Sequence, residues 1–563
     1  MSDDYMIIDG IPVAIEGERN ILELIRKAGI DLPTFCYHSE LSVYGACRMC
    51  MVENKWGGID AACSTPPKAG AEIFTNTKKL RKHRKMILEL LLSNHCRDCT
   101  TCEKNENCKL QELASRFGIN NVRFPNAKPT PDIDDSSLAI TRDKNKCILC
   151  GDCVRMCNEV QNVKAINFAY RGSNMIVATA FDKPIAKSPC VGCGQCAAVC
   201  PTGAITIKND ISRLWSEIDK EDVRVVAQIA PAVRVAVASA FGYKGSNVMG
   251  KIVASMRRIG FDEIFDTATG ADLTVIEEAE EFLKRLERGE KLPLFTSCCP
   301  AWVNYCEKNY TELIANLSTC KSPMQMFGSV IKEEYKESAK RVINVAIMPC
   351  TAKKFEAARE EFRYDGESFV IDYVITTQEL IQMIKECGIV FNDIEPEAID
   401  MPFGSISGAG VIFGVTGGVT EAVIRKVASD KSLSALRRLA FNGVRGLEGV
   451  KEVKIPFDDK ELKIAVVSGL MNADNLIKRV LAGEHYDLIE VMACPGGCIN
   501  GAGQPYTDFK GREQRSKGLY EADKMCTNKR SDENPLMSNL YDGLLKGKAH
   551  DLLHVHYGLK GDK

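Results

Sequence analysis

The stretches CILCGDCVRMC at residues 147–157 and CVGCGQCAAVCP at residues 190–201 decide the fold of the N-terminal third of the chain. Both place their cysteines with the spacing C-x2-C-x2-C-x3-C, so the second stretch repeats the first. Clustered cysteines in an intracellular chain are more often metal ligands or catalytic groups than disulfides. The repeat therefore predicts a small domain built around metal ligands.

This repeat resembles the sequence of bacterial two-cluster ferredoxins, in which the fourth cysteine of each motif ligates the other cluster. A role in ordinary core packing is much less favoured, because the spacing is duplicated. The resemblance implies one 4Fe-4S cluster on Cys147, Cys150, Cys153 and Cys200, and a second on Cys190, Cys193, Cys196 and Cys157.

A further group of cysteines lies near the N-terminus, after two short alternating apolar runs that meet at Asp9-Gly10. Asp-Gly between such runs is a strong hairpin signal, and residues 21–29 read as a short helix. The order of strand, turn, strand, helix and cysteine loop resembles the β-grasp domain of 2Fe-2S ferredoxins. A zinc ribbon is less favoured, since structural zinc sites usually come as two close cysteine pairs. The expected 2Fe-2S ligands are Cys36, Cys47, Cys50 and Cys63.

A third set of ligands follows a predicted amphipathic helix at residues 78–93. Cys99, Cys102 and Cys108 are three of its members, and spacing alone leaves open whether His95 or Cys96 is the fourth. The pattern resembles a 4Fe-4S site with one histidine and three cysteines, found in hydrogenases and in a respiratory NADH dehydrogenase subunit. That resemblance favours His95.

The whole-chain composition is that of a globular protein that needs no disulfides. The chain has 563 residues, of which 45% are hydrophobic and 26% charged, and the length predicts about three to five domains. Its net charge of -2 indicates neither a nucleic-acid nor a membrane partner. The most apolar stretch, residues 223–241, is too short and too polar to span a bilayer, and no signal peptide is visible, so we expect a cytoplasmic protein.

Beyond residue 211 the sequence alternates between apolar strand-like runs and helices, as in an α/β domain. Three motifs each place a cysteine just past the end of such a run, where open α/β sheets form their ligand crevice. Buried free cysteine is also a common small core residue, so this spacing alone is moderate evidence for a single site. The motifs are TSCCPAW at 296–302, MPCTAKKFE at 348–356 and EVMACPGGC at 490–498.

Together with the N-terminal blocks in the same order, these motifs resemble the three signatures of FeFe-hydrogenases of the monomeric clostridial type. The resemblance implies an enzyme that interconverts two protons plus two electrons with H2. It also implies a multidomain α+β and α/β fold. We expect a 2Fe-2S ferredoxin-like domain at 1–78, a histidine-ligated 4Fe-4S domain at 79–125, a two-cluster 4Fe-4S domain at 126–209, an H-cluster catalytic domain with parallel sheets at 210–510 and a closing segment at 511–563.

The resemblance further implies an H-cluster, a 4Fe-4S cubane joined to a di-iron subsite that carries CO, cyanide and a bridging dithiolate amine. Its expected ligands are Cys299, Cys350, Cys494 and Cys498, and Lys353 is expected to hydrogen-bond an iron-bound cyanide. For the apolar wall residues, ordinary packing is an adequate alternative. The expected cofactor contacts are Pro323, Met348, Met492, Phe413, Ala230 and Pro231.

A proton path can be traced in part from a helix predicted at residues 274–289, where Thr274 and Glu277 have the spacing of a capping box. Charged residues on one flank of this helix would ordinarily be solvated surface. By the resemblance, the path to solvent instead runs through Cys298, Glu278, Ser318, Glu281 and Arg285.

Three other features are weaker. The glycines at 404–418 match no phosphate-loop pattern, so nucleotide binding is not expected. His550 and His554 lie four residues apart, but no cysteine or carboxylate partner is evident, so a surface or packing role is favoured over a metal pair. Cys320 is unexpected beside Ser318; a core role is favoured over a redox-sensitive thiol.

The expected partners are a ferredoxin or flavodoxin as electron donor and maturation proteins for the di-iron subsite, with the chain a monomer. Two readings compete with the enzyme. A non-catalytic H2 sensor or iron–sulfur assembly relative would share the fold, but assembly relatives lose active-site cysteines that are all present here. An electron-wire subunit of an NADH dehydrogenase would account for residues up to about 209 only, and would leave the three later motifs unexplained.

Overall fold

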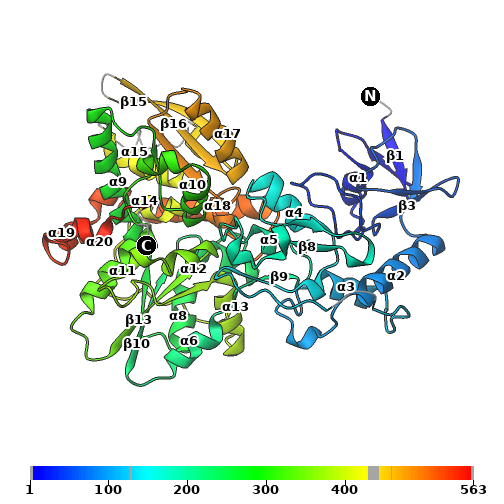
Figure 1. Cartoon of the computed structure of the whole chain (residues 1–563), viewed down its shortest axis with the longest axis horizontal. Coiled ribbons are helices and arrows are strands. Elements are labelled where there is room, and N and C mark those ends of the chain that lie inside the picture. The colour runs from blue at the N-terminus through cyan, green and yellow to red at the C-terminus, as the bar shows by residue number, and fades with distance from the viewer. Residues whose placement is uncertain (1–3, 127–129, 429–442, 458–459, 559–563) are drawn as a thin grey trace.

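The computed structural model describes residues 4–126, 130–428, 443–457 and 460–558. The N-terminal elements up to residue 116 form one end of the molecule and the α/β domain forms the other, and the repeat, with α4 (Asp152–Arg155) and α5 (Gln195–Ala198), lies between them (Figure 1). Among the described residues, no helix is both long and apolar enough to cross a membrane.

The N-terminal domain is a five-stranded sheet with the order β2-β1-β5-β3-β4. The hairpin turns at Asp9 and Gly10, both with positive φ, and β1 pairs in parallel with β5, as in a β-grasp sheet. The predicted helix is α1, which begins after the Asn20 cap. The elements are β1 (Tyr5–Ile8), β2 (Ile11–Ala14), α1 (Ile21–Lys27), β3 (Met51–Asn54), β4 (Ile59–Ala61) and β5 (Glu72–Phe74).

The next two domains are small and organised by short helices. Helix α2 (Lys78–Ser93) has the bounds that its periodicity predicts, because the Thr77 side chain caps its first turn. In the repeat, Gly151 and Gly194 adopt left-handed φ of 77° and 69° and each begins a short helix, so the duplication extends to the backbone. The remaining elements are α3 (Lys109–Arg116), β6 (Ile140–Arg142), α4 (Asp152–Arg155), β7 (Asn167–Ala169), β8 (Ile176–Ala178), α5 (Gln195–Ala198) and β9 (Ile205–Ile207).

The α/β domain contains two four-stranded sheets. The sheet β11-β10-β13-β14 is parallel throughout, whereas in β12-β17-β16-β15 only the edge strand β15 is antiparallel. Burial on both faces explains why these strands read as continuous apolar runs. The strands are β10 (Val223–Ile229), β11 (Glu263–Asp266), β12 (Leu294–Phe295), β13 (Arg341–Met348), β14 (Tyr373–Thr376), β15 (Val450–Phe457), β16 (Lys460–Ser468) and β17 (Leu488–Met492).

Helices cover these sheets, and the long helix α9 packs against α11, α14 and α15. Its approach to α11 is close, because a Cβ on Gly270 would lie 2.8 Å from the Phe327 Cβ atom. The helices are α6 (Ile211–Ile218), α7 (Val233–Ala240), α8 (Met249–Ile259), α9 (Ala268–Arg288), α10 (Pro300–Asn309), α11 (Pro323–Glu334), α12 (Ala352–Ala357), α13 (Thr377–Glu386), α14 (Gly408–Val411), α15 (Gly418–Val427), α17 (Leu470–Leu481), α18 (Phe509–Met525), α19 (Pro535–Asp542) and α20 (Ala549–Leu553).

The expected start of α9 was wrong. The helix begins at Ala268, six residues before Thr274, so Thr274 lies in its interior and forms no capping box with Glu277. Its hydroxyl instead donates to the Gly270 carbonyl at 2.9 Å, the local bond that Ser and Thr make inside helices.

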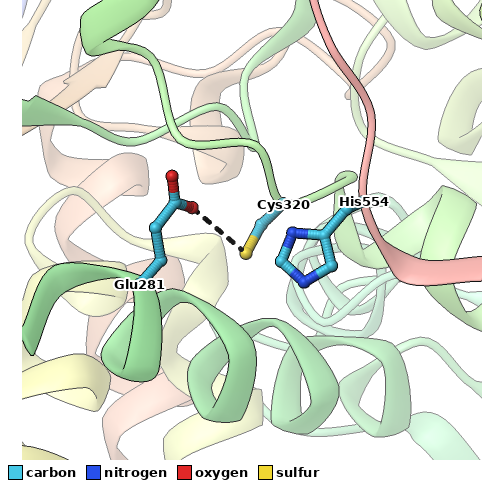
Figure 2. Close-up of side chains that lie close together, drawn as sticks. All are labelled: Glu281, Cys320 and His554. Atoms are coloured by element: carbon cyan, nitrogen blue, oxygen red, sulfur yellow. Dashed lines mark hydrogen bonds between the residues drawn. The ribbon is translucent and has the colours of Figure 1, made fainter. Parts of the chain in front are cut away.

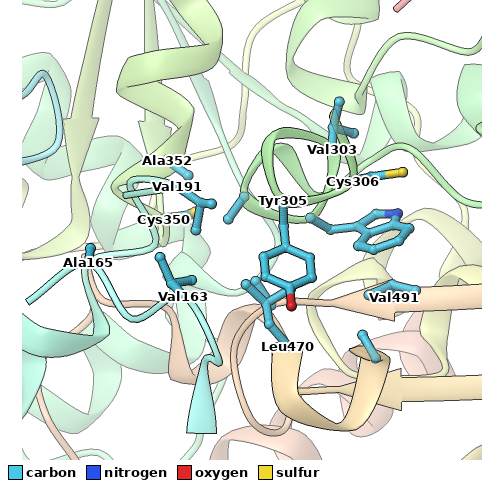
Figure 3. Close-up of a cluster of buried hydrophobic side chains, with 14 of the residues drawn as sticks. Val163, Ala165, Val191, Val303, Tyr305, Cys306, Cys350, Ala352, Leu470 and Val491 are labelled. Atoms are coloured by element: carbon cyan, nitrogen blue, oxygen red, sulfur yellow. The ribbon is translucent and has the colours of Figure 1, made fainter. Parts of the chain in front are cut away.

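One hydrophobic core joins the two-cluster domain to the α/β domain. Val163, Ala165 and Val191 of the former pack in the same cluster as Tyr305 and Leu470 of the latter (Figure 3). The two parts therefore form one body, and the predicted multidomain α+β and α/β fold is confirmed.

Candidate active site and cluster-binding sites

The carboxyl ends of three strands, two from one sheet and one from the other, lie close together. Cys299 follows β12, Cys494 follows β17 in the same sheet, and Cys350 follows β13 of the other sheet. The carboxyl ends of parallel strands are where α/β proteins bind their ligands. The topology therefore brings together three cysteines from distant parts of the sequence.

The four thiols predicted to hold the H-cluster converge at these strand ends. Cys350 and Cys494 are buried, and the Cys299 sulfur accepts the Ala493 N–H at 3.4 Å. Burial raises the pKa of each of the four thiols, and the charges of the others raise the pKa of Cys350, Cys494 and Cys498 further. Four thiols held this close fit a cationic metal cluster, because metal coordination favours the thiolate.

The apolar wall of this site comes mainly from one side. Phe413 and Met492 belong to a hydrophobic cluster against which Cys298, Cys299 and Cys498 pack. The structure brings these residues together as the motifs imply.

The other predicted wall residues lie elsewhere around the strand ends. Met348 and Ala230 pack in the core of the β10–β13 sheet, the Pro231 carbonyl accepts the Arg234 side chain at 3.0 Å, and Pro323 begins α11. Their contact with a bound cofactor stays a prediction.

Lys353 brings a buried cation to the site. Its ammonium donates to the Cys298 carbonyl at 3.3 Å and to Glu356 at 2.6 Å. Burial lowers the pKa of Lys353, but the Glu356 carboxylate together with Cys350 and Cys298 raises it, and the net pKa is raised, so the lysine stays charged. Sequence reasoning overlooked Glu356, although it lies three residues after Lys353 on α12.

Cys298 and Glu278 form the inner end of the predicted proton path. Glu278 is buried and Cys298 is half-buried, and desolvation followed by the charge of the Glu278 carboxylate raises the pKa of the Cys298 thiol. Among the described residues neither Glu278 carboxylate oxygen makes a hydrogen bond of normal geometry, but the Ser318 hydroxyl lies close enough to lower the pKa of Glu278. Burial, and then the charge of Glu281, raises the pKa of Glu278 to about 8. Glu278 is therefore a buried carboxyl that keeps its proton at neutral pH.

The outer end of the path is a continuous set of hydrogen bonds. The Ser318 hydroxyl donates to the Glu281 Oε2 atom at 3.0 Å, and the Glu281 Oε1 atom accepts from Arg285 at 2.5 Å. Arg285 also donates to the Leu317 carbonyl at 2.9 Å. Glu278, Glu281 and Arg285 lie along α9 as the periodicity predicts, but this flank is largely buried rather than solvated.

Glu490 is a buried acid that sequence reasoning missed, and it positions the glycine-rich segment beside the site. It lies on β17, and its carboxylate accepts the backbone N–H of Gly417 at 2.6 Å and of Thr420 at 2.8 Å, at the start of α15. A carboxylate is stabilised at a helix N-terminus. The sequence signal that could have identified Glu490 is a charged residue within the apolar run of β17, because a buried acid almost always has a partner.

The glycines at 404–418 serve close packing. A Cβ on Gly497 would lie 2.6 Å from the Thr416 nitrogen, and one on Gly414 would lie 3.1 Å from the Ala232 Cβ atom. Both contacts bring the glycine-rich segment against loops of the site.

Two cavities in the two-cluster domain are lined by the thiols in the crossed grouping. One is lined by Cys147, Cys150 and Cys153 of the first motif together with Cys200 of the second. The other is lined by Cys190, Cys193, Cys196 and Cys157. Each cavity thus takes three thiols from one motif and the fourth from the other, and the donor set of each fits a 4Fe-4S cluster.

The thiols expected for the 2Fe-2S cluster also converge. The Cys36 sulfur lies within hydrogen-bond reach of Cys47 and Cys63, and Cys50 lies within reach of Cys63. The backbone N–H of Phe35 points at the Cys47 sulfur at 3.4 Å. This donor set fits a 2Fe-2S cluster.

In the predicted histidine-containing site, the His95 and Cys96 side chains have different surroundings. His95 lines one pocket with Cys99 and Cys108, and the charges of Cys102 and Cys99 both act on Cys108. The Cys96 thiol donates instead to Asp98 at 3.1 Å. The geometry therefore favours His95 as the fourth ligand.

Short contacts connect the sites in series. Gln195 donates to the Asn500 carbonyl at 3.0 Å, and the Thr351 hydroxyl donates to the Gly192 carbonyl at 2.8 Å, so the second repeat motif is fastened to the strand-end loops. A Cβ on Gly203 would lie 2.6 Å from the Cys102 sulfur, so the histidine-containing site adjoins the repeat.

Comparison with known families supports this division of the chain. Residues 223–502 match the family described as iron only hydrogenase large subunit, C-terminal domain, and residues 509–560 match iron hydrogenase small subunit. The N-terminal matches are a 2Fe-2S iron-sulfur cluster binding domain at 6–78, an NADH-ubiquinone oxidoreductase-G iron-sulfur binding region at 84–123 and a 4Fe-4S dicluster domain at 146–205.

Individual relatives extend over nearly the whole chain. The NADP-reducing hydrogenase subunit HndD of Solidesulfovibrio fructosivorans is 41% identical, over 99% of this chain and 99% of its own. Iron hydrogenase 1 of Clostridium pasteurianum is 35% identical, over 98% of this chain and 99% of its own. A solved structure of apo FeFe-hydrogenase HydA1 from Chlamydomonas reinhardtii, in a variant form, superposes with a TM-score of 0.53 at 36% identity and covers 62% of this chain and 99% of that one.

The fold and its convergent thiols define an iron–sulfur oxidoreductase with ferredoxin-like domains preceding an α/β catalytic domain. More particularly, the chain belongs to the iron-only, or FeFe, hydrogenase family.

Proposed function

We propose that this chain catalyses the reversible conversion of two protons and two electrons into H2 at an H-cluster held by Cys299, Cys350, Cys494 and Cys498. The observation that carries the proposal is the meeting of these thiols beside Cys298 and Glu278, two proton carriers that no ligand set needs. When bound, the cofactor supplies the redox chemistry at iron. The protein supplies its position, an apolar wall and protons.

In this proposal, protons travel between the site and solvent through side chains of α9 and the residues packed against it. Burial keeps Cys298 and Glu278 neutral, so each can hold a proton without placing a charge in the pocket. The Ser318 hydroxyl carries the proton to Glu281, whose second oxygen pairs with Arg285. Lys353 remains the fixed cation beside the cofactor.

Four accessory clusters, one 2Fe-2S and three 4Fe-4S, would supply electron transfer when bound. Cys36 and Cys150 belong to one hydrophobic cluster, with Cys108 packed against it, so residues that would hold three of the clusters lie around the first cavity of the repeat. The second cavity of the repeat lies next to the strand-end loops. This arrangement gives two entry branches and a single path to the active site.

The proposed electron partner is a ferredoxin or flavodoxin, with maturation proteins assembling the di-iron subsite. The relative HndD is named as a subunit of an NADP-reducing hydrogenase, so a larger complex is the second possibility for the monomer proposed from the sequence. The chain has no dinucleotide fingerprint, so nicotinamide use would require another subunit.

Infrared spectroscopy of the matured protein tests the proposal. We expect carbonyl and cyanide bands in the metal-ligand region, and we expect them to change when H2 is admitted. Bands that do not respond to H2 would support a non-catalytic relative, and absence of bands after maturation would remove the H-cluster from this chain.

A further inference from the structure

Three metal-binding side chains that the proposed reaction does not use as ligands meet beside α9. The Glu281 carboxylate, the Cys320 thiol and the His554 imidazole each present a ligand atom, and these atoms all lie within 4.8 Å of one another (Figure 2). They come from α9, from the loop before α11 and from the end of α20. We propose that they form a site for a divalent, thiol-binding cation of the zinc type, and that the bound cation blocks proton transfer.

The backbone brings Cys320 and His554 together without help from a ligand. The two residues form an antiparallel bridge, flanked by hydrogen bonds from Lys321 N–H to the Leu553 carbonyl at 2.8 Å and from Val555 N–H to the Thr319 carbonyl at 2.7 Å. We expected His554 to have no cysteine or carboxylate neighbour, because the sequence around it contains none. This expectation was wrong, since the fold brings Cys320 and two glutamates from distant segments to His554.

The orientation of His554 is already that of a metal ligand. Its Nε2 atom lies 3.0 Å from the Glu277 carboxylate, which Tyr541 also hydrogen-bonds. A carboxylate can only accept, so Nε2 carries the hydrogen. Nδ1 accepts the Thr319 hydroxyl at 2.8 Å, and a bound cation would take the place of that hydroxyl on Nδ1. Figure 2 shows the nitrogen nearer the backbone attachment, Nδ1, facing the Cys320 sulfur. A carboxylate behind a histidine is the usual support of a metal-binding imidazole.

The donor set fits a small, thiol-binding cation. Zinc binds sulfur, imidazole and carboxylate at about 2.0–2.3 Å in a tetrahedron, with water able to take the fourth position. Tetrahedral ligand atoms lie about 3.3–3.8 Å apart, so the present spacing needs a closure of about 1 Å, within reach of side-chain rotation. The Cys320 sulfur lies 3.8 Å from the Glu281 Oε2 atom, so this pair is already near that spacing. Cys320 releases its proton when the metal binds.

The consequence for catalysis rests on the proposed proton path. The carboxylate oxygen that faces the Cys320 sulfur is Oε2, which also accepts the Ser318 hydroxyl, whereas Oε1 is paired with Arg285. A cation on Oε2 would occupy the lone pairs that take the proton from Ser318. The side chains of Glu281 and His554 are 12% and 10% exposed, so the site lies at the outer end of the path, within reach of a small ion.

The test is zinc K-edge X-ray absorption on the matured full chain, treated with a chelator and then given one equivalent of Zn²⁺. Because the absorption edge belongs to zinc, the iron clusters do not interfere. We expect one sulfur at about 2.3 Å and nitrogen or oxygen ligands at about 2.0 Å. The sulfur shell should vanish in Cys320→Ala and persist in Cys387→Ser, which removes an exposed thiol elsewhere.

Histidine variants provide a second, independent readout by titration with Zn²⁺. His554→Gln should weaken zinc affinity strongly, whereas His550→Gln should not, although the two rings stack with centroids 4.7 Å apart. Glu277→Gln should weaken zinc affinity about 10- to 100-fold through loss of support to the imidazole. A sulfur shell that survives Cys320→Ala, or an affinity that survives His554→Gln, would overturn the site.

Activity is measured with and without Zn²⁺, so each variant is its own reference. Saturating zinc should lower H2 evolution at least tenfold in the parent protein and less than twofold in Cys320→Ala. Zinc bound with the expected sulfur shell but without inhibition would keep the site and overturn its blocking role, together with the Ser318 to Glu281 step. Failure to bind zinc would leave the proposed reaction untouched.

Discussion

At the scale of single residues, Cys298 can be tested by exchanging one atom, the thiol sulfur, for oxygen. Replacing Cys298 by serine keeps a hydrogen-bonding group of similar size, but a hydroxyl releases its proton far less readily than a thiol. We expect Cys298→Ser to keep all cluster signals and to lower H2 turnover by about 100-fold or more, the scale of a lost general acid–base group.

The control for this change is Cys387→Ser, whose thiol is exposed at the C-terminal end of α13. Iron content and infrared bands of both variants should equal those of the parent. Parent-like turnover in Cys298→Ser would remove this thiol from the proton path.

Glu278 gives a pH-dependent prediction with a definite sign. Its folded pKa is raised to about 8 by burial and by the Glu281 charge, so the carboxyl is protonated below that pH and ionises above it. We expect the infrared C=O band of a protonated carboxyl to disappear with a midpoint near pH 8, and to be missing in Glu278→Gln at every pH.

The same variant should slow H2 evolution and H2 uptake alike, because an amide cannot relay the proton in either direction. Glu280→Gln is the matched control, since Glu280 lies on the same helix with a side chain 55% exposed. A titrating C=O band that persists in Glu278→Gln belongs to another acid and would contradict the assignment.

The choice between His95 and Cys96 is settled by removing each in turn. His95→Ala should lose one 4Fe-4S cluster, seen as about four fewer iron atoms per chain and a missing electron paramagnetic resonance signal. Cys96→Ala should keep both, because its thiol is directed at Asp98. The reverse result would make Cys96 the ligand.

At the scale of elements, local signals predicted those helices and strands whose ends are marked by their own residues. Helix α2 matches its predicted bounds because Thr77 caps it. The apolar runs at 292–295, 342–348 and 488–493 predict the strands before Cys299, Cys350 and Cys494 to within two residues. The start of α9 was missed because Gly270, a poor helix former, lies between Ala268 and Thr274, so a capping-like Thr274 was mistaken for its beginning.

Burial of whole faces could not be predicted from local pattern. The flank of α9 that carries Glu278 and Glu281 reads as solvated surface, yet residues 317–320 and the C-terminal segment cover it. The pairing of Cys320 with His554 joins positions 234 residues apart, and no periodicity records such a contact. The sequence motifs identify the candidate ligands, but the neighbours of these ligands depend on long-range packing, which the motifs do not predict.

Glu490 holds the start of helix α15, and this role can be tested. Its two carboxylate oxygens each accept a backbone N–H, and a glutamine can accept with only one of them. Glu490→Gln should therefore leave one buried donor unpaired, at a cost of about 1–3 kcal/mol to that turn. We expect faster amide hydrogen exchange in the peptide containing Gly417 and Thr420.

The matched change on the same sheet is Glu461→Gln, which removes an exposed carboxylate paired with Lys454 at 3.0 Å. It should leave that peptide unaffected. Equal exchange in both variants would mean that the helix start is held by packing alone.

At the scale of the whole molecule, the contacts that join domains decide how electrons reach the active site. Arg155 lies on α4 between two ligands of the repeat, and it donates to the carbonyl of Cys36, a predicted 2Fe-2S ligand, at 3.0 Å. It also pairs with buried Asp152 and hydrogen-bonds the Ser42 carbonyl. One side chain thus fastens the N-terminal domain to the two-cluster domain.

Arg155→Gln should slow electron transfer between the expected 2Fe-2S cluster and the 4Fe-4S clusters of the repeat. The guanidinium no longer reaches across the boundary, and Asp152 loses the cation that opposes the burial-driven rise of its pKa to about 7, so the carboxyl takes up a proton. Removing one member of a buried ion pair costs about 3–5 kcal/mol, enough to loosen the domain contact. Because electron tunnelling falls steeply with distance, transfer between the 2Fe-2S cluster and the repeat should slow.

Rapid-freeze electron paramagnetic resonance after mixing with a reduced ferredoxin measures this transfer. In Arg155→Gln the 2Fe-2S signal and the 4Fe-4S signals should rise at different rates, whereas Arg171→Gln, a change at an exposed position of the same domain, should match the parent. Both variants should keep their full iron content, so a difference reflects coupling rather than cluster loss. If the signals rise together in Arg155→Gln as in the parent, the domain contact through Cys36 does not control the electron path, and entry through the histidine-containing site becomes the favoured route.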